Sequence, residues 1–244
     1  MRFEVVQGDL ELTSHAGLVL VEAALSHTRL RERVNKVNLP HCPGPKISNG
    51  DLIATMIGLI SLGKPDFEAV EPFRDDPFFR EALGLRAVPS SSRLRQRLDQ
   101  VQGRFDRILQ EESARLAPKV TPCQGKLVAL DIDVSPWDNS GSHKEGVEFT
   151  YKGFCGYAPV LAYLGEEGYV ADAELRPGSM HCQKGAPEFI RRSIGYARMM
   201  TGAPVLVRMD GGNDSLENIR VCQEEKVDWL IKRNPRRESE GDLL

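Results

Sequence analysis

The apolar positions of this chain change their spacing near residue 118. Before that point they recur with helical spacing, as in the run Leu18, Val19, Val21, Leu25 and Leu30, which predicts an amphipathic helix. Further helices are expected at 52–62, around 67–73, after Asp76, and after the serines at 90–92. Residues 1–10 could form a short strand. We therefore predict an all-α region over residues 1–118.

After a break at 118–125, the chain has the short apolar and alternating runs that are typical of strands. The expected order is a strand at 126–133, strands within 147–164 and at 169–175, a helix at 186–200, a strand at 205–209, a helix at 215–226 and a strand at 227–231. A ribonuclease H-like fold begins in this order, with its first and fourth strands side by side. The fold class predicted for residues 119–244 is therefore α/β, a mixed sheet with flanking helices.

Two of the expected strands end in carboxylates. Asp131 and Asp133 lie on one face of the first strand because side chains alternate along a strand, and Asp210 ends the strand that begins near Pro204. Such an acid is costly to bury unless it is paired, hydrogen-bonded or bound to a cation. Neighbouring strands would bring Asp131 or Asp133 close to Asp210, and paired carboxylates suit Mg²⁺ or Mn²⁺. A single such aspartate is more often a loop cap or an ion-pair partner, but two in this strand order favour metal-dependent phosphodiester chemistry.

Composition narrows the class of protein. The 244 residues are 41% hydrophobic and 27% charged, which is ordinary for a globular protein. A formal net charge of −3 does not indicate a nucleic-acid binder, so only a local basic face could serve that role. The five cysteines form no C-x-x-C pair, which argues against a zinc site or a disulfide framework. With no export signal and no apolar run long enough to span a bilayer, we expect a cytoplasmic protein without a membrane partner.

The most basic expected helix follows the serines at 90–92. It carries five arginines: Arg93, Arg95, Arg97, Arg104 and Arg107. A helix N-terminus with hydroxyls and guanidiniums can bind DNA phosphates. The same arginines could instead form ion pairs with the acids at 99, 106, 111 and 112 on a solvated surface. The sequence leaves both interpretations open.

Four segments together resemble the DDE transposases of bacterial insertion sequences: LDIDVSPWDNS, TYKGFCGYAPVLAYL, ELRPGSMHCQKGAPEFI and VLVRMDGGNDSLENI. The resemblance is close over residues 126–234 and looser in the helical region. It implies a ribonuclease H-like catalytic domain preceded by a DNA-binding helical region. It also implies that the protein binds terminal inverted repeats and target DNA, forms a homo-oligomer in the synaptic complex, and performs cut-and-paste movement with two Mg²⁺ ions.

The resemblance also assigns roles to residues. The family often has Asp, one residue, then Ser or Thr, which selects Asp133 with Ser135, while Asp131 stays a second candidate. The second family carboxylate falls on Asp210. Residues in the matching segments that could contact DNA or phosphate are Tyr151, Lys152, His181, Lys184 and Arg208. A packed strand aromatic is an equally good interpretation of Tyr151.

One family feature is not reached before Leu244. The third acid, a glutamate on a helix after the fifth strand, has no counterpart, because Glu217, Glu224 and Glu225 lie on the preceding helix. The chain is therefore expected to correspond to the N-terminal part of a transposase and to lack strand-transfer activity alone. Two alternatives remain: a repair or RNA-processing nuclease of the same fold, and an inactive DNA-binding remnant that represses transposition.

Overall fold

The computed structural model describes residues 13–40 and 46–235. The chain divides into two compact units, Met1–Glu112 and Ser113–Leu244. The short strand considered for residues 1–10 lies outside the described residues.

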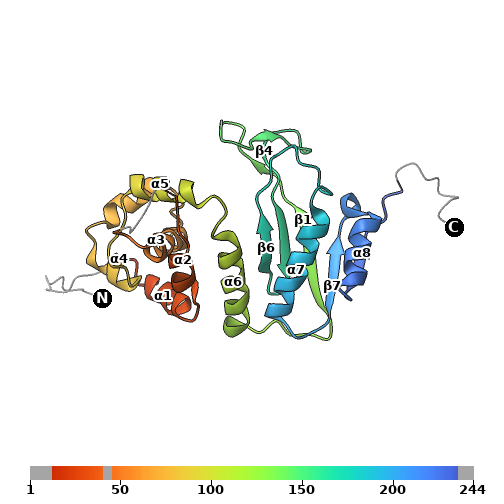
Figure 1. The fold of residues 1–244 in the computed structure, drawn as a ribbon, viewed down its shortest axis with the longest axis horizontal. Coiled ribbons are helices and arrows are strands. Elements are labelled where there is room, and N and C mark those ends of the chain that lie inside the picture. The colour runs from red at the N-terminus through yellow and green to blue at the C-terminus, as the bar shows by residue number, and fades with distance from the viewer. Residues whose placement is uncertain (1–12, 41–45, 236–244) are drawn as a thin grey trace, which may run out of the picture. The chain divides into compact units, whose positions relative to one another are not determined.

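The first unit is helical where it is described (Figure 1). Its elements are α1 (Leu18–Ser26), α2 (Leu30–Asn35), α3 (Asn49–Ser61), the 3₁₀ helix η1 (Phe67–Phe73), α4 (Pro77–Ala82), α5 (Ser91–Val101) and the start of α6 (Asp106–Val120). The side chains of Ser48, Asp76 and Ser90 accept hydrogen bonds from the first-turn backbone of α3, α4 and α5. Helix α4 begins directly after Asp76 as predicted, whereas α3 begins at Asn49, three residues before the predicted start.

The amphipathic helix expected to reach Leu30 is instead two helices. The hydroxyl of Thr28 donates to the carbonyl oxygen of Leu25 at 2.6 Å and accepts from the backbone N–H of Leu30 at 3.3 Å. This side chain therefore satisfies backbone groups at the end of α1 and the start of α2, so the backbone turns between them. Apolar spacing alone did not reveal the break, because Leu25 and Leu30 are buried on either side of it.

The second unit is built on a five-stranded sheet (Figure 1). The strand order is β6 (Tyr169–Glu174), β5 (Val160–Leu164), β1 (Val128–Val134), β7 (Val205–Met209) and β8 (Asp228–Ile231). The central strand β1 runs antiparallel to β5 and parallel to β7. In chain order β1 and β7 are the first and fourth strands of this sheet, so the predicted adjacency is confirmed, and with it the ribonuclease H-like mixed sheet.

Helix α7 (Ala186–Met200) and helix α8 (Leu216–Glu224) flank the sheet. Side chains such as Leu130 and Val207 point into the core with Ile190 and Ile194 of α7, and each of these four is fully buried. Because side chains alternate, the other face of β1 and β7 carries the charged residues. The burial of one face thus decides which side chains β1 and β7 present on the other.

The first of the strands expected within 147–164, at 147–154, is shorter than predicted. Of these residues only Glu148–Phe149 (β3) form a strand, which pairs with β4 (Cys155–Tyr157); β4 also pairs with β2 (Trp137–Asp138) in a separate small sheet. Between β3 and β4 the chain turns tightly, because the backbone N–H and the hydroxyl of Thr150 both donate to the carbonyl oxygen of Phe154. This hairpin becomes one wall of the site.

Across the part of the chain that is described, no helix combines the length and the apolar character needed to cross a membrane.

Candidate active site

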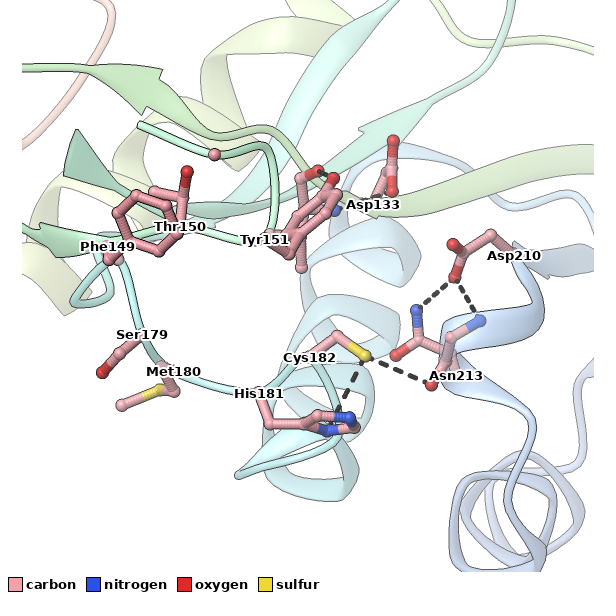
Figure 2. A pocket seen from close by; sticks show the side chains of 14 residues that line it. Asp133, Phe149, Thr150, Tyr151, Ser179, Met180, His181, Cys182, Asp210 and Asn213 are labelled. Atoms are coloured by element: carbon pink, nitrogen blue, oxygen red, sulfur yellow. Dashed lines mark hydrogen bonds between the residues drawn. The ribbon is translucent and has the colours of Figure 1, made fainter. Parts of the chain in front are cut away.

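The two strand-end aspartates lie side by side. Residues Ile132 of β1 and Met209 of β7 are register partners, so the next residue on each strand is Asp133 and Asp210 respectively. Neighbouring strands lie about 4.8 Å apart. Both side chains are exposed, and both line the same pocket, which has a volume of about 650 Å³ (Figure 2). The acids of two distant segments therefore meet on one face of the sheet.

Each of these carboxylates is held by one oxygen. Oδ1 of Asp133 accepts from the backbone N–H of Val134 at 2.8 Å. Oδ1 of Asp210 accepts from the backbone N–H of Gly212 at 3.1 Å and from Nδ2 of Asn213 at 3.0 Å. Within the described residues, the Oδ2 atom of each aspartate accepts no hydrogen bond. Two oriented carboxylates with a spare oxygen apiece are the hard ligands that Mg²⁺ and Mn²⁺ bind, so the residues present fit such a cation.

Asp131 has a different environment from Asp133. Its carboxylate forms a two-pronged ion pair with Arg208 of β7, with Nε to Oδ1 and Nη2 to Oδ2 both at 2.6 Å. The two residues are register partners, which explains why they meet. Both oxygens of Asp131 and the guanidinium of Arg208 are therefore engaged with each other. Of the two aspartates on β1, Asp133 is the one whose second oxygen is available to a ligand.

The pocket has two walls beside the acids. One wall is formed by residues 149–151 and Gly153, where β3 turns toward β4. The segment from Gly178 to Cys182 forms the other wall (Figure 2). The side chain of Cys182 lies near the acids, and its Sγ donates to the carbonyl oxygen of Gly212 at 3.2 Å.

The pKa values of two side chains near the acids keep them protonated. Although the Tyr151 ring is exposed, its hydroxyl is partly buried against Val134; this desolvation raises the pKa of the phenol, and the charges of Asp133 and Asp210 raise it further. Burial and the charge of Asp210 likewise raise the pKa of the Cys182 thiol. At neutral pH these groups are a phenol and a thiol, so Cys182 does not offer the thiolate that soft metals require. The available ligands are carboxylate oxygens.

The two walls are fixed to each other at Gly178. A Cβ atom added there would overlap the carbonyl oxygens of Glu148 and Gly156, so only glycine allows the segment to pack this closely on the small sheet. The hydroxyl of Ser179 also hydrogen-bonds the carboxylate of Glu148. The spacing of the pocket walls therefore depends on a residue without a side chain.

We expect Gly178→Ala to lower the free energy of unfolding by about 1–3 kcal/mol, because the methyl group forces the backbone apart. The matched control is Gly195→Ala on α7, where an added Cβ meets nothing within 4 Å. That change should raise the free energy of unfolding by about 0.5–1 kcal/mol, since glycine is unfavourable inside a helix. Urea denaturation measures both, and equal effects of the two changes would contradict the packing described here.

Comparison with known proteins identifies the family. The family model for the transposase DDE domain group 1 matches residues 5–237. The chain belongs to this transposase family. Transposases of the DDE type are enzymes and generally use divalent metal ions. No curated protein matches the chain.

Solved structures with some similarity to this transposase are themselves transposases. The piggyBac transposase synaptic complex with hairpin DNA has 14% identity and a TM-score of 0.34, covering 94% of this chain and 52% of that one. The Mos1 transposase paired-end complex with the left transposon end has 12% identity and a TM-score of 0.27, covering 92% of this chain and 79% of that one. The chain spans about half the length of the piggyBac chain.

The arginines predicted to contact DNA differ in exposure. Arg93 is exposed in the first turn of α5, and Arg104 is exposed while donating to the carbonyl oxygens at the end of that helix. Arg95 is exposed too, but it pairs with Glu68. Arg97 departs from the expected role: it is 2% exposed and donates to Asn49 and to the carbonyl oxygen of Ile47, so the helical core encloses it.

Two lysines predicted to contact DNA are exposed, and both are close in sequence to residues that line the pocket. Lys152 lies on the hairpin beside Tyr151, with its ammonium 5.4 Å from the centre of that ring, and Lys184 follows the pocket-lining segment. Arg208 differs from them, because it is already paired with Asp131.

Sequence reasoning missed several residues of this site. Asn213, which hydrogen-bonds Asp210, was not predicted as a site residue, and neither were Phe149 and Met180. Among the described residues, no group of three or more His, Cys, Asp or Glu side chains could hold a metal ion. The alternation of Phe149 and Tyr151 in the strand expected from residue 147 was the available signal for the aromatic wall.

Proposed function

We propose that this transposase binds the terminal inverted repeats of its own element. When complete, and as part of a homo-oligomer that pairs two ends, it cleaves and transfers DNA strands, with Asp133 and Asp210 as metal-binding acids of its active site. The observation that carries the proposal is the pair of spare carboxylate oxygens on adjacent strands, both facing one pocket. In this proposal Asp133 and Asp210 hold Mg²⁺ or Mn²⁺. When bound, such cations activate a water or a 3′-hydroxyl and stabilise the leaving oxygen in an attack on phosphorus.

The protein's own contribution is orientation. The N–H of Val134 fixes one carboxylate, and Gly212 with Asn213 fixes the other, so neither has to be ordered when a ligand arrives. The neutral phenol of Tyr151 donates to the carbonyl oxygen of Val134 at 3.3 Å, beside the acids. Asp131 and Arg208 neutralise each other next to the site. Of the three aspartates at these strand ends, Asp133 and Asp210 therefore keep a negative charge that can attract a cation.

In the same proposal the helical unit supplies recognition of the repeat. Arg93 is exposed in the first turn of α5, and Arg104 is exposed three residues after its end, while the hydroxyls of Ser90 and Ser92 lie at the N-terminus of this helix. Guanidiniums bind backbone phosphates, and this electrostatic contribution depends on local charge rather than on the net charge of the chain.

A binding competition tests this function. A labelled duplex carrying the inverted repeat of the element should resist competition by a random duplex, with an affinity at least about a thousandfold higher. Arg93→Ala and Arg104→Ala should weaken binding and lower the salt dependence by about one counterion each. Arg80→Ala, an exposed arginine on α4, is the charge-matched control and should leave binding unchanged.

This competition, together with a cleavage assay, also distinguishes the transposase from the two alternative functions. Equal binding of repeat and random duplexes would contradict the proposal and favour a nuclease of the same fold. Specific binding without metal-dependent cleavage would favour a DNA-binding remnant that represses transposition.

A further inference from the structure

Two aromatic side chains are unusually exposed beside the acids. Phe149 is 66% exposed and Tyr151 is 69% exposed, and both line the pocket that also contains Asp133 and Asp210. Single exposed apolar residues are common on protein surfaces and need no explanation. Two aromatic rings on one wall of a pocket next to a pair of carboxylates are a different case, because they provide flat apolar surface at the place where phosphate chemistry is proposed.

The opposite wall makes this part of the pocket a slot. Met180 and His181 lie across from Phe149 and Tyr151 (Figure 2). We refer to the space bounded by Phe149, Tyr151, Met180 and His181 as the aromatic slot. A flexible thioether facing aromatic rings favours contact with the face and edge of another flat ring. The chemistry of the slot therefore suits a planar, largely apolar group rather than a second phosphate.

The aromatic slot is already formed without a ligand. The hydrogen bonds of Thr150 to Phe154 fix the turn that contains Tyr151, and the close packing at Gly178 fixes the opposite segment to the same small sheet. The phenol of Tyr151 is anchored to β1 through the carbonyl oxygen of Val134. A ligand that enters the slot loses little free energy to reorganisation of the protein, which is the condition for selective binding.

The size of the pocket restricts the ligand further. At about 650 Å³ it falls in the range of roughly 300–1,000 Å³ that is typical of sites for small ligands. Such a pocket can admit one nucleotide that has left its helix, whereas a base that stays stacked in a duplex cannot place its face against a protein side chain.

We propose that the aromatic slot stacks an unpaired nucleobase, next to the phosphate held at Asp133 and Asp210. The position of that phosphate rests on the function proposed above, but the stacking itself does not. Base stacking on aromatic side chains tolerates any base, so the slot selects for unpaired DNA rather than for a sequence. Lys152, beside the Tyr151 ring, is placed to contact the backbone of the same strand.

The test compares two single strands with the same charge. One is oligothymidine, and the other is an abasic deoxyribose-phosphate strand of equal length. Fluorescence anisotropy without divalent metal measures both affinities, so the result does not depend on cleavage. The wild-type protein should bind oligothymidine about 5- to 100-fold more tightly than the abasic strand, as expected for stacking of one base.

Single substitutions test whether the preference for oligothymidine arises at the aromatic slot. Phe149→Ala and Tyr151→Ala should remove most of the preference for oligothymidine, while Tyr151→Phe, which keeps the ring, should retain it. Trp137→Ala is the matched control, because Trp137 is 51% exposed on the same small sheet but does not line the pocket. Thermal denaturation checks that the variants fold, and an oligothymidine that carries 5-iodouracil should cross-link to the peptide containing Phe149 and Tyr151.

Equal affinity of the wild-type protein for the two strands would overturn the proposal, as would a preference that survives in both alanine variants or a cross-link confined to another peptide. A base preference in a protein that does not cleave DNA would leave the slot intact and contradict only the proposed cleavage. Cleavage by a protein that shows no base preference would contradict the aromatic slot and leave the proposed cleavage intact.

Discussion

In the complete transposase, Asp133→Asn or Asp210→Asn will reduce Mg²⁺-dependent cleavage of an inverted-repeat duplex at least about a thousandfold, because metal-assisted charge stabilisation supplies several kcal/mol and about 1.4 kcal/mol is a factor of ten. Asparagine preserves the size of the side chain but removes the charge that attracts a cation. Each aspartate is exposed, so the loss of activity should come without unfolding. Cleavage rates measured at several Mg²⁺ concentrations give the size of the effect.

Asp131→Asn is the control for this experiment. Asp131 lies on the same face of β1 but is paired with Arg208, so its substitution should change the rate only a few-fold. Exposed ion pairs contribute about 0–1 kcal/mol to stability, so this variant should also fold normally. If Asp131→Asn abolished cleavage while Asp133→Asn did not, the assignment of the two aspartates would have to be exchanged.

Arg192→Ala will lower the free energy of unfolding by about 3 kcal/mol at neutral pH, because it leaves the carboxylate of Asp172 buried without its cation. Asp172 lies on β6 and is 1% exposed, and its Oδ2 accepts from Nε of Arg192 at 2.7 Å. The expected loss is at the low end of the range for buried pairs, since 39% of the Arg192 side chain is in contact with solvent. Urea denaturation measures it.

The pH dependence of this loss has a definite sign. Burial raises the pKa of Asp172 above its ordinary value, although the Arg192 guanidinium opposes the shift, and removing Arg192 raises the pKa further. A carboxyl group whose pKa is higher in the folded than in the unfolded state binds more protons when folded, so stability increases as pH falls through that range. The difference between Arg192→Ala and the wild type should therefore shrink at acidic pH.

The neighbouring arginine provides a matched control. Arg191 pairs with Glu224 and Glu225 on the surface, so Arg191→Ala should cost no more than about 1 kcal/mol, and any narrowing of this difference at acidic pH cannot exceed that amount. Equal losses for Arg191→Ala and Arg192→Ala would mean that the buried position of Asp172 does not govern this part of the fold.

The pairing of β1 with β7 could be predicted from the sequence, because it depends on features that are local or topological. The alternation around Asp131 and Asp133 predicts a strand with both acids on one face, and the order of strands and helices predicts that β7 lies beside it. The meeting of Asp133 with Asp210 follows from these two facts and from the position of each acid at a strand end.

The partners of individual side chains could not be predicted in the same way. Only the register of β1 and β7 reveals that Arg208 faces Asp131 rather than DNA. Arg97 is polar and lies among other arginines, yet its helix turns it into the core, where Asn49 accepts its hydrogen bond. The aromatic slot depends on close packing at Gly178, which brings together backbone segments that are distant in sequence, and on a turn at Thr150 that interrupts the expected strand.

Binding of Mn²⁺, followed by the electron paramagnetic resonance signal of the free ion, tests most directly whether Asp133 and Asp210 share a cation site. The account predicts that the wild-type protein and Asp131→Asn take up Mn²⁺ with similar affinity, while Asp133→Asn and Asp210→Asn each lose at least about tenfold. Unchanged Mn²⁺ affinity in both Asp133→Asn and Asp210→Asn would contradict it.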